Sequence, residues 1–163
     1  MAHSGRKGTE SQTMHLPGVA PAFHPALHRE YCASVYVCHN FRLRSGSPNA
    51  SFTDWIAARG YSSYAFLTAY NPYSNRQLSR ADNLALAQVL RNRIKDLAID
   101  AVPAAAVDVT GTWPEEVGLM LLGVDLGTAL QLGREFQQNA ILYGKTGNAA
   151  AVLWCECRLP SPI

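Results

Sequence analysis

The sequence predicts an α+β fold in which two helices cover one face of a largely antiparallel sheet. Three observations favour this class. Short runs rich in β-branched and aromatic residues, typical of strands, recur from residue 31 onward. Two longer segments with apolar residues at helical spacing lie between those runs. The 163 residues, 48% of them hydrophobic, suffice to bury the core of one domain without disulfides or a metal.

The first predicted elements lie in the N-terminal half of the folded region. Residues 31–39 have the composition of a strand. Residues 51–54 have the form of a capping box, with aspartate in place of the usual glutamate, which predicts a short helix over 54–59. Residues 64–70 alternate as a strand does, and Pro72 ends that strand because proline cannot donate to a strand ladder.

A long helix is expected over 80–98, because Ser79 is a natural N-cap and neither glycine nor proline interrupts the run. Two strands should follow over 104–110 and 118–124, and then a second helix over 126–137. The inner faces of the two helices would carry Ala87, Leu90, Ile94 and Leu97 in the first, and Leu126, Ala129, Leu130, Gly133 and Phe136 in the second.

The last predicted elements are strands over 139–144 and 149–157, joined by a hairpin turn at 145–148. The order over residues 63–144 is then β-α-β-β-α-β, the split βαβ arrangement of ferredoxin-like folds. We therefore expect a ferredoxin-like core with one additional strand before it and one after it.

A single domain is expected over residues 30–158, between a flexible leader at 1–29 and a short tail at 159–163. The leader is rich in glycine, proline and serine. No apolar run in the sequence is long enough for a signal-peptide core or a membrane span. These features favour a cytoplasmic protein that does not contact the membrane.

Cysteine and histidine spacing argues against a metal or another cofactor. The cysteines of a cytoplasmic protein are reduced thiols. Cys32 and Cys38 would lie about 20 Å apart on one strand, too far to share a zinc ion. Cys155 and Cys157 have no neighbouring CxxC or histidine pair to complete a site. A histidine pair at i, i+4 in the leader is discounted because Pro25, between them, disfavours a helix.

Charge and motif content narrow the function further. The net charge of +2 comes from 14 basic and 12 acidic residues, too even a balance for a surface that coats DNA. The signatures GxSxG, GxxxxGK[ST], HExxH and GxGxxG do not occur. Glu115 and Glu116 are the remaining acid–base candidates, although neighbours in a strand point to opposite faces and a loop pair could simply complement backbone amides. The sequence leaves open whether the protein is an enzyme.

Polar residues, most of them uncharged, collect at predicted strand ends and in loops of four separate segments. Amides and hydroxyls supply donors and acceptors without charge, which suits the orientation of a small ligand. Each also has a structural interpretation, since Asn71 is a good turn residue and Trp113 could close one end of the core. We expect these residues to line one ligand pocket: Tyr70, Asn71, Ser74, Asn83, Trp113, Glu115, Gln138 and Asn139.

At these clusters the sequence resembles the bacterial domain-of-unknown-function family numbered 3293, over about residues 31–153. The resemblance rests on four motifs: Leu67-Thr-Ala-Tyr-Asn-Pro-x-Ser74, Asp82-Asn83, Trp113-x-Glu115-Glu116 and Phe136-x-Gln138-Asn-Ala-Ile141. The chain departs from the family pattern at Asp82, Gln137 and Val117, where the family commonly has Glu, Gly and a small residue such as Ser. The resemblance implies a small bacterial cytoplasmic protein, and it implies no activity.

Three functions are therefore weighed. The preferred one is a small-ligand or nucleotide-binding domain with a polar pocket at the strand ends. The alternative is a non-enzymatic module for protein–protein interaction or self-association through a sheet edge. The weakest is single-stranded RNA binding, suggested by Tyr64, Phe66 and Tyr70 on one strand face. Residues 118–123 lack the basic and aromatic residues that an RNA-recognition module carries in its central motif, so nucleic acid is an improbable partner.

Overall fold

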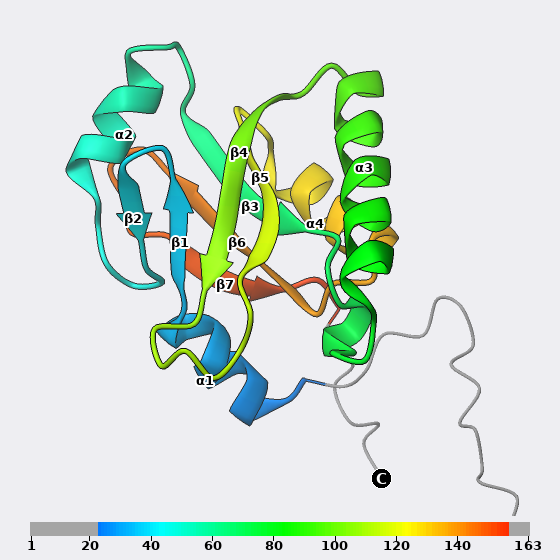
Figure 1. Cartoon of the computed structure of the whole chain (residues 1–163). Coiled ribbons are helices and arrows are strands. Elements are labelled where there is room, and N and C mark those ends of the chain that lie inside the picture. The colour runs from blue at the N-terminus through cyan, green and yellow to red at the C-terminus, as the bar shows by residue number, and fades with distance from the viewer. Residues whose placement is uncertain (1–22, 157–163) are drawn as a thin grey trace, which may run out of the picture.

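The computed structural model describes residues 23–156, which form four α-helices, one short 3-10 helix and seven strands (Figure 1). The helices are α1 (Pro25–Ala33), α2 (Ala50–Ala57), α3 (Arg80–Asp96) and α4 (Leu126–Glu135), and the 3-10 helix is η1 (Pro72–Ser74). The strands are β1 (Val35–Cys38), β2 (Phe41–Leu43), β3 (Ser63–Thr68), β4 (Asp100–Val107), β5 (Glu116–Leu122), β6 (Ala140–Lys145) and β7 (Ala151–Trp154).

All seven strands belong to one curled sheet in the order β2-β1-β4-β5-β3-β6-β7. Every neighbouring pair is antiparallel. The predicted α+β class and antiparallel sheet are confirmed. Strand β3 lies inside the sheet and pairs with β5 on one side and β6 on the other. The segment that follows β3 therefore leaves the sheet between the ends of β5 and β6.

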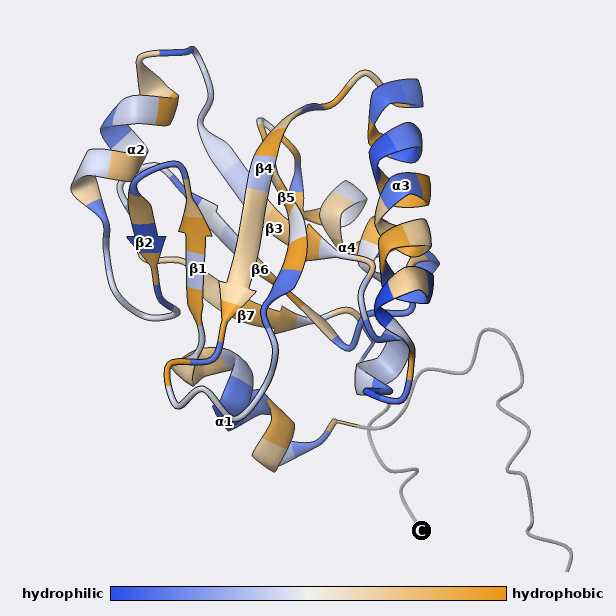
Figure 2. Ribbon diagram, in the orientation of Figure 1, coloured by the Kyte–Doolittle hydropathy of each residue, from blue (hydrophilic) through white to orange (hydrophobic). Residues whose placement is uncertain are grey.

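The sheet buries apolar residues on both faces, which explains why every residue of β3 is buried. Helices α3 and α4 cover one face, where Leu67 and Leu121 pack with Leu90 and Leu132. Helix α2 covers part of the other face. Figure 2 shows the same division, with apolar strands and a hydrophilic outer side on α3. The two helices expected on one face, α3 and α4, lie there, and α2 adds cover on the second face, which was not expected.

The N-terminal boundary of the sheet differs from the prediction. Residues 31–33 complete helix α1, and the strand begins at Val35. Pro25 starts this helix rather than preventing it, because the missing N–H of proline costs nothing in the first turn. His24 is the N-cap, and its ring nitrogen accepts from the amide of Leu27 at 3.2 Å. Helix α1 thus begins inside the segment expected to be a flexible leader.

Helix α2 also starts earlier than the capping-box pattern predicted. Asn49 is its N-cap and accepts from the Phe52 amide at 3.0 Å, and the helix ends at Ala57 rather than Arg59. Asparagine is among the strongest N-cap residues, so Asn49 rather than Ser51 caps the helix. The cap predicted at Ser79 is confirmed, since Ser79 is the N-cap of α3, and Asp125 is the N-cap of the second long helix, α4.

Smaller differences concern the helix faces and the C-terminal end. Leu97 and Leu126, expected on inner faces, are exposed, whereas Leu132 is buried on α4. Strand β7 ends at Trp154, and Cys157 lies outside the described residues. Within residues 23–156 no helix is long and apolar enough to span a membrane, and no three His, Cys, Asp or Glu side chains are placed to share a metal ion.

Candidate functional site

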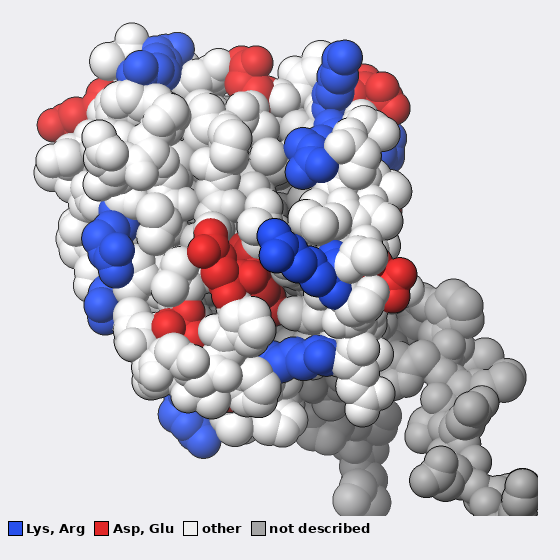
Figure 3. Space-filling model, viewed as in Figure 1, with Lys and Arg blue, Asp and Glu red and all other residues white. Residues whose placement is uncertain are grey.

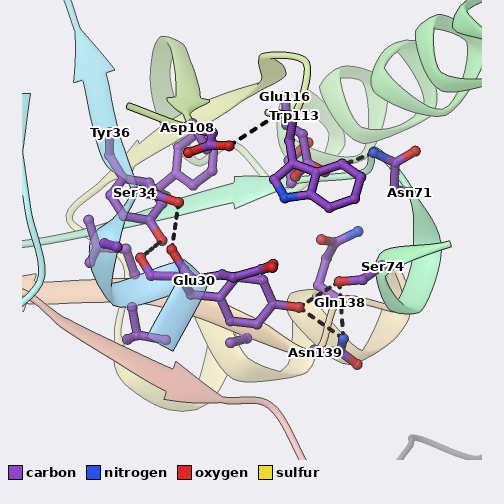
Figure 4. Close-up of a pocket in the computed structure, with 18 of the residues that line it drawn as sticks. Glu30, Ser34, Tyr36, Asn71, Ser74, Asp108, Trp113, Glu116, Gln138 and Asn139 are labelled. Atoms are coloured by element: carbon purple, nitrogen blue, oxygen red, sulfur yellow. Dashed lines mark hydrogen bonds between the residues drawn. The ribbon is translucent and has the colours of Figure 1, made fainter. Parts of the chain in front are cut away.

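A cavity of about 450 Å³ opens at the end of the sheet where β3 stops and β5 and β6 begin. Helix α1, the loop after β3, the loop between β4 and β5, and the start of β6 contribute to its lining (Figure 4). Its apolar lining includes Tyr36, Phe66, Leu142 and Val152. This size and mixed lining are typical of pockets that hold small organic molecules.

Three side chains form a hydrogen-bonded chain along the wall of the cavity that the strand ends supply. Asn83, on the first turn of α3, accepts from the Asn71 amide at 2.9 Å and donates from Nδ2 to Asn71 Oδ1 at 3.0 Å. Asn71 Nδ2 then donates to Glu116 Oε1 at 2.8 Å, a bond drawn in Figure 4. The side chain of Asn71 thus links Asn83 to Glu116 and holds the Glu116 carboxyl in place.

A second cluster joins α1 to the loops on either side of it. Asn139 Nδ2 donates to the Tyr31 hydroxyl at 3.0 Å and to Ser74 Oγ at 3.3 Å, and the two hydroxyls are 2.5 Å apart (Figure 4). Burial raises the pKa of Tyr31, against the opposing effect of these hydrogen bonds, so its hydroxyl keeps its proton at neutral pH. Asn139 Oδ1 is buried without a partner among the described residues.

Gln138 lies between these clusters and is 9% exposed. Its Nε2 donates to the carbonyls of Tyr70 at 3.1 Å and Phe136 at 3.2 Å. Both amide hydrogens are therefore used for holding the backbone. Its Oε1 accepts from no donor within residues 23–156, and Gln138 lines the cavity.

The backbone at this site is held in sparsely populated conformations. Asn71, Tyr73 and Ser74 have φ of 46°, 50° and 60°, and Gln137 has φ of 53°. Each such residue costs about 1–3 kcal/mol and persists where the surrounding structure enforces it, often at functional sites. The Tyr73 amide donates to the Gln137 carbonyl at 2.6 Å, which ties the two strained segments together.

Arg76 lies at the opening of the cavity between an aromatic ring and a carboxylate. Its guanidinium carbon is 3.6 Å from the centre of the Trp113 ring, and Nη2 is 3.1 Å from Glu30 Oε2. Trp113 is 41% exposed. Its loop is shaped by Asp108, which accepts from the Trp113 amide at 3.0 Å. The opening is therefore formed by side chains from α1, the loop after η1 and the loop before β5.

Glu116 is the acidic group set most deeply in the cavity. Burial raises the pKa of this carboxyl, while the hydrogen bond from Asn71 and the charge of Arg76 act in the opposite direction. Hydrogen bonds from Thr110 lower the pKa of Asp108. In the space-filling view, acidic side chains gather near the middle of this face, over the ends of β4 and β5, with basic side chains beside them (Figure 3).

Comparison with known families gives one match. Residues 67–141 match the model of a family described as "Protein of unknown function (DUF3293)". Over this segment the chain belongs to that family. No curated protein and no solved structure matches the chain.

The DUF3293 segment is shorter than the range of about 31–153 over which the motifs resemble the family, and it supplies only part of the cavity lining. It contains Asn71, Glu116 and Gln138, and with them the wall at the strand ends. Helix α1, which contributes Glu30 and Tyr31, lies outside it. The family segment therefore carries the polar wall, and α1 adds the opposite side.

The structure brings most of the sequence-predicted site residues together. The cavity is lined by Asn71, Ser74, Trp113, Gln138 and Asn139, and by Glu116 of the two acid–base candidates. Tyr70 and Asn83 are buried behind the lining, where they hold Gln138 and Asn71. Glu115 is exposed and does not line the cavity.

Sequence reasoning missed the side chains from α1 and the opening, namely Glu30, Tyr31, Ser34, Arg76 and Asp108. The residues of α1 were missed because that segment was assigned to the leader and to a strand. A proline directly after a potential N-cap histidine was the signal that could have indicated the helix. Arg76 and Asp108 had no motif to single them out.

Proposed function

We propose that this protein binds a small organic molecule in the cavity at the strand ends. The observation that carries the proposal is the unused hydrogen-bonding capacity of Gln138, a 9% exposed side chain on the cavity wall whose Oε1 accepts from no donor among residues 23–156. Buried polar atoms are nearly always paired with protein or water, so unpaired ones in a cavity of this size favour a ligand that completes them.

The same lining favours an organic ligand over a simple ion. The apolar residues Tyr36, Phe66 and Val152 supply surface for a carbon skeleton, and the polar groups stand at one side of it. Strained backbone at Asn71 and Ser74 supports the proposal, because such strain is characteristic of binding and catalytic sites.

A thermal-shift screen of small metabolite-like molecules tests the proposal. A ligand at a hundred times its Kd stabilises the folded state by about 2.7 kcal/mol, which raises the Tm of a domain of this size by about 5–11 °C. The shift should be lost in Trp113→Ala, at the opening, and kept in Val109→Ala, an exposed residue of the same loop that does not line the cavity. A folded protein that no compound stabilises, or shifts equal in both variants, would contradict the proposal.

The two alternatives receive less support. Tyr64, Phe66 and Tyr70, the rings that suggested RNA binding, are each 8% exposed or less, which leaves little ring area for stacking on bases. The edge strands β2 and β7 are three and four residues long, which limits the backbone they offer to a partner strand.

A finer fold assignment is part of the proposal. Within the sheet the core strands have the order β4-β5-β3-β6, so β5 separates β3 from β4, the two strands that α3 connects. Separation of the two strands of a βαβ unit by a third is what a split βαβ arrangement means. This order supports a ferredoxin-like core with β7 after it and with two strands, β1 and β2, before it, where one was expected.

A further inference from the structure

Building on the proposed binding function, we propose that the ligand is a small organic cation of the amine, amidine or guanidine class, bound with its positive group against Glu116 and Gln138. Three observations lead to this class: the balance of free acceptors and donors in the cavity, the balance of charge around it, and the contacts of the guanidinium that already lies at its opening.

Free acceptors are the first observation. Glu116 uses Oε1 to accept from Asn71, and its Oε2 has no donor among residues 23–156. Gln138 uses both hydrogens of Nε2 on backbone carbonyls, so only its Oε1 is available to a ligand. Asn139 Oδ1 also lacks a partner among these residues, but it is buried and points away from the open space (Figure 4). Figure 4 shows Glu116, Asn71 and Gln138 around the same space.

Most side-chain donors deep in the cavity are already used. In the cluster of Tyr31, Ser74 and Asn139, the amide donates to both hydroxyls, and one hydroxyl donates to the other. A single hydroxyl hydrogen is left over. Further free donors lie at the opening, on Trp113 Nε1 and on the Arg76 guanidinium, for which one N–H is used on Glu30. An ammonium brings three donors and a guanidinium five, with no acceptor to satisfy, which suits the free acceptors of Glu116 and Gln138.

The charge of the lining points the same way. Three carboxylates line the cavity, and Arg76 is the one basic side chain among the described lining residues. Arg76 is paired with Glu30, and the oxygens of Asp108 are occupied by Thr110 and the Trp113 amide. Glu116 has no Lys, Arg or His within ion-pair distance in residues 23–156. A half-buried carboxylate with no direct ion-pair partner favours a ligand that supplies one.

The opening already holds a cation of this class. The Arg76 guanidinium lies 3.6 Å over the Trp113 ring and 3.1 Å from Glu30. An indole face and a carboxylate are the groups that stabilise an organic cation through cation–π and ionic contacts. A ligand would enter past this pair, with its carbon skeleton against Trp113 and its cationic group beyond it, near Glu116.

Three planar probes of matched shape and different charge test the ligand class. Benzamidine is cationic, benzamide is neutral and benzoate is anionic. In isothermal titration of the full chain, benzamidine should bind about tenfold or more tightly than benzamide, and benzoate should bind weakest. An equal or reversed order among the three would overturn the proposal.

Charge-removing variants identify the carboxylate involved. Glu116→Gln should weaken benzamidine binding about tenfold or more and change benzamide binding less than about threefold. Glu115→Gln is the matched control, because it removes the same charge from the neighbouring residue, which is exposed and outside the cavity. Equal losses in the two variants would mean that the preference comes from overall charge and not from this site.

The pH dependence gives an independent readout. Benzamidine stays cationic across the neutral range, so its affinity should fall as the pH is lowered and Glu116 takes up a proton, and this dependence should disappear in Glu116→Gln. The other charged or titratable groups of the lining lie on α1, β1, the loop after η1 and the loop after β4: Glu30, Tyr31, Tyr36, Arg76 and Asp108. They are common to both proteins, so the difference between the two pH profiles reports Glu116.

The outcomes separate this inference from the function on which it rests. If neutral or anionic compounds bind and lose binding in Trp113→Ala, the cavity is a ligand site but the cation class is wrong. If no compound of any charge stabilises the folded protein, the proposed function itself fails.

Discussion

Asn83 and Asn71 exchange two hydrogen bonds, through which the first turn of α3 fixes the loop that follows β3. One bond satisfies the Asn71 amide at 2.9 Å and the other satisfies its side-chain oxygen at 3.0 Å. Asn71 has φ of 46°, so the pair also holds a backbone conformation that few side chains adopt readily. The position of Glu116 depends on this arrangement, since Asn71 Nδ2 donates to it.

Asn83→Ala should lower the free energy of unfolding by about 1–3 kcal/mol, because it leaves the Asn71 amide and Oδ1 without their partners in a partly buried setting. Chemical denaturation monitored by circular dichroism measures the change. Asn92→Ala is the matched control, since the same residue type lies on the exposed side of the same helix. Equal effects of the two substitutions would show that the Asn83 pair contributes nothing specific.

Substitutions at Asn71 separate its backbone role from its side-chain role. Asn71→Gly keeps a residue that tolerates positive φ, whereas Asn71→Ala adds about 1–2 kcal/mol of left-handed strain. Both lose the bonds to Asn83 and Glu116. The glycine variant should therefore be the more stable of the two, as measured by denaturant midpoints. An alanine variant as stable as the glycine one would contradict the strain at this position.

The buried carboxyl of Glu116 predicts a pH dependence of stability. Its pKa is raised above the ordinary value of 4.5, so the folded protein holds this proton more tightly than the unfolded chain does. The free energy of unfolding should therefore fall as the pH rises from near 4.5 through the raised value. Glu116→Gln should remove that fall, and Tm values of both proteins over this range measure it.

Two other carboxyls act in a different pH window and do not obscure this effect. Hydrogen bonds lower the pKa values of Asp108 and Asp125 below 3.8, so their contributions are lost only at more acidic pH. A difference in Tm between wild type and Glu116→Gln that stays constant with pH would mean that Glu116 titrates normally.

Two glycines of α4 should respond oppositely to alanine. A Cβ on Gly133 would overlap Cys155 Sγ, so Gly133→Ala should destabilise the fold by about 1–3 kcal/mol. A Cβ on Gly127 would meet only Asp125 Oδ1 at 3.4 Å, so Gly127→Ala should be neutral or stabilise by up to about 1 kcal/mol. Thermal denaturation measures both. Adding Cys155→Ala to Gly133→Ala should recover part of the loss, and a failure to do so would place the clash elsewhere.

Much of the fold could be predicted because its signals are local. The caps at Ser79 and Asp125 and the alternation through β3 depend on neighbouring residues, and each marks an element that the structure contains. Helix α1 was missed because its aromatic residues suit a strand as well as a helix. The cap at His24 with Pro25 after it was the local signal for a helix, whereas the packing of the helix against β7 is indicated by no local pattern.

The candidate site could be predicted only in part, for a related reason. Most of the residues named from motifs do gather at one cavity, because in an antiparallel sheet the end of one strand lies beside the start of its neighbour. The partners that complete it lie far along the chain: Tyr31 meets Asn139, 108 residues away. Such a pairing follows from the three-dimensional arrangement, and nothing in the spacing of the sequence indicates it.

The position of β3 also has a consequence for how the chain acquires its structure during synthesis. Strand β3 is made before both of its neighbours, β5 and β6, and every one of its residues is buried in the finished sheet. The apolar side chains and backbone groups of β3 therefore lack part of their contacts until Lys145, the last residue of β6, has been added. Pairings between such distant segments form slowly and leave unpaired strand edges prone to aggregation. A nascent chain halted before β6 is the species that we expect to need a chaperone.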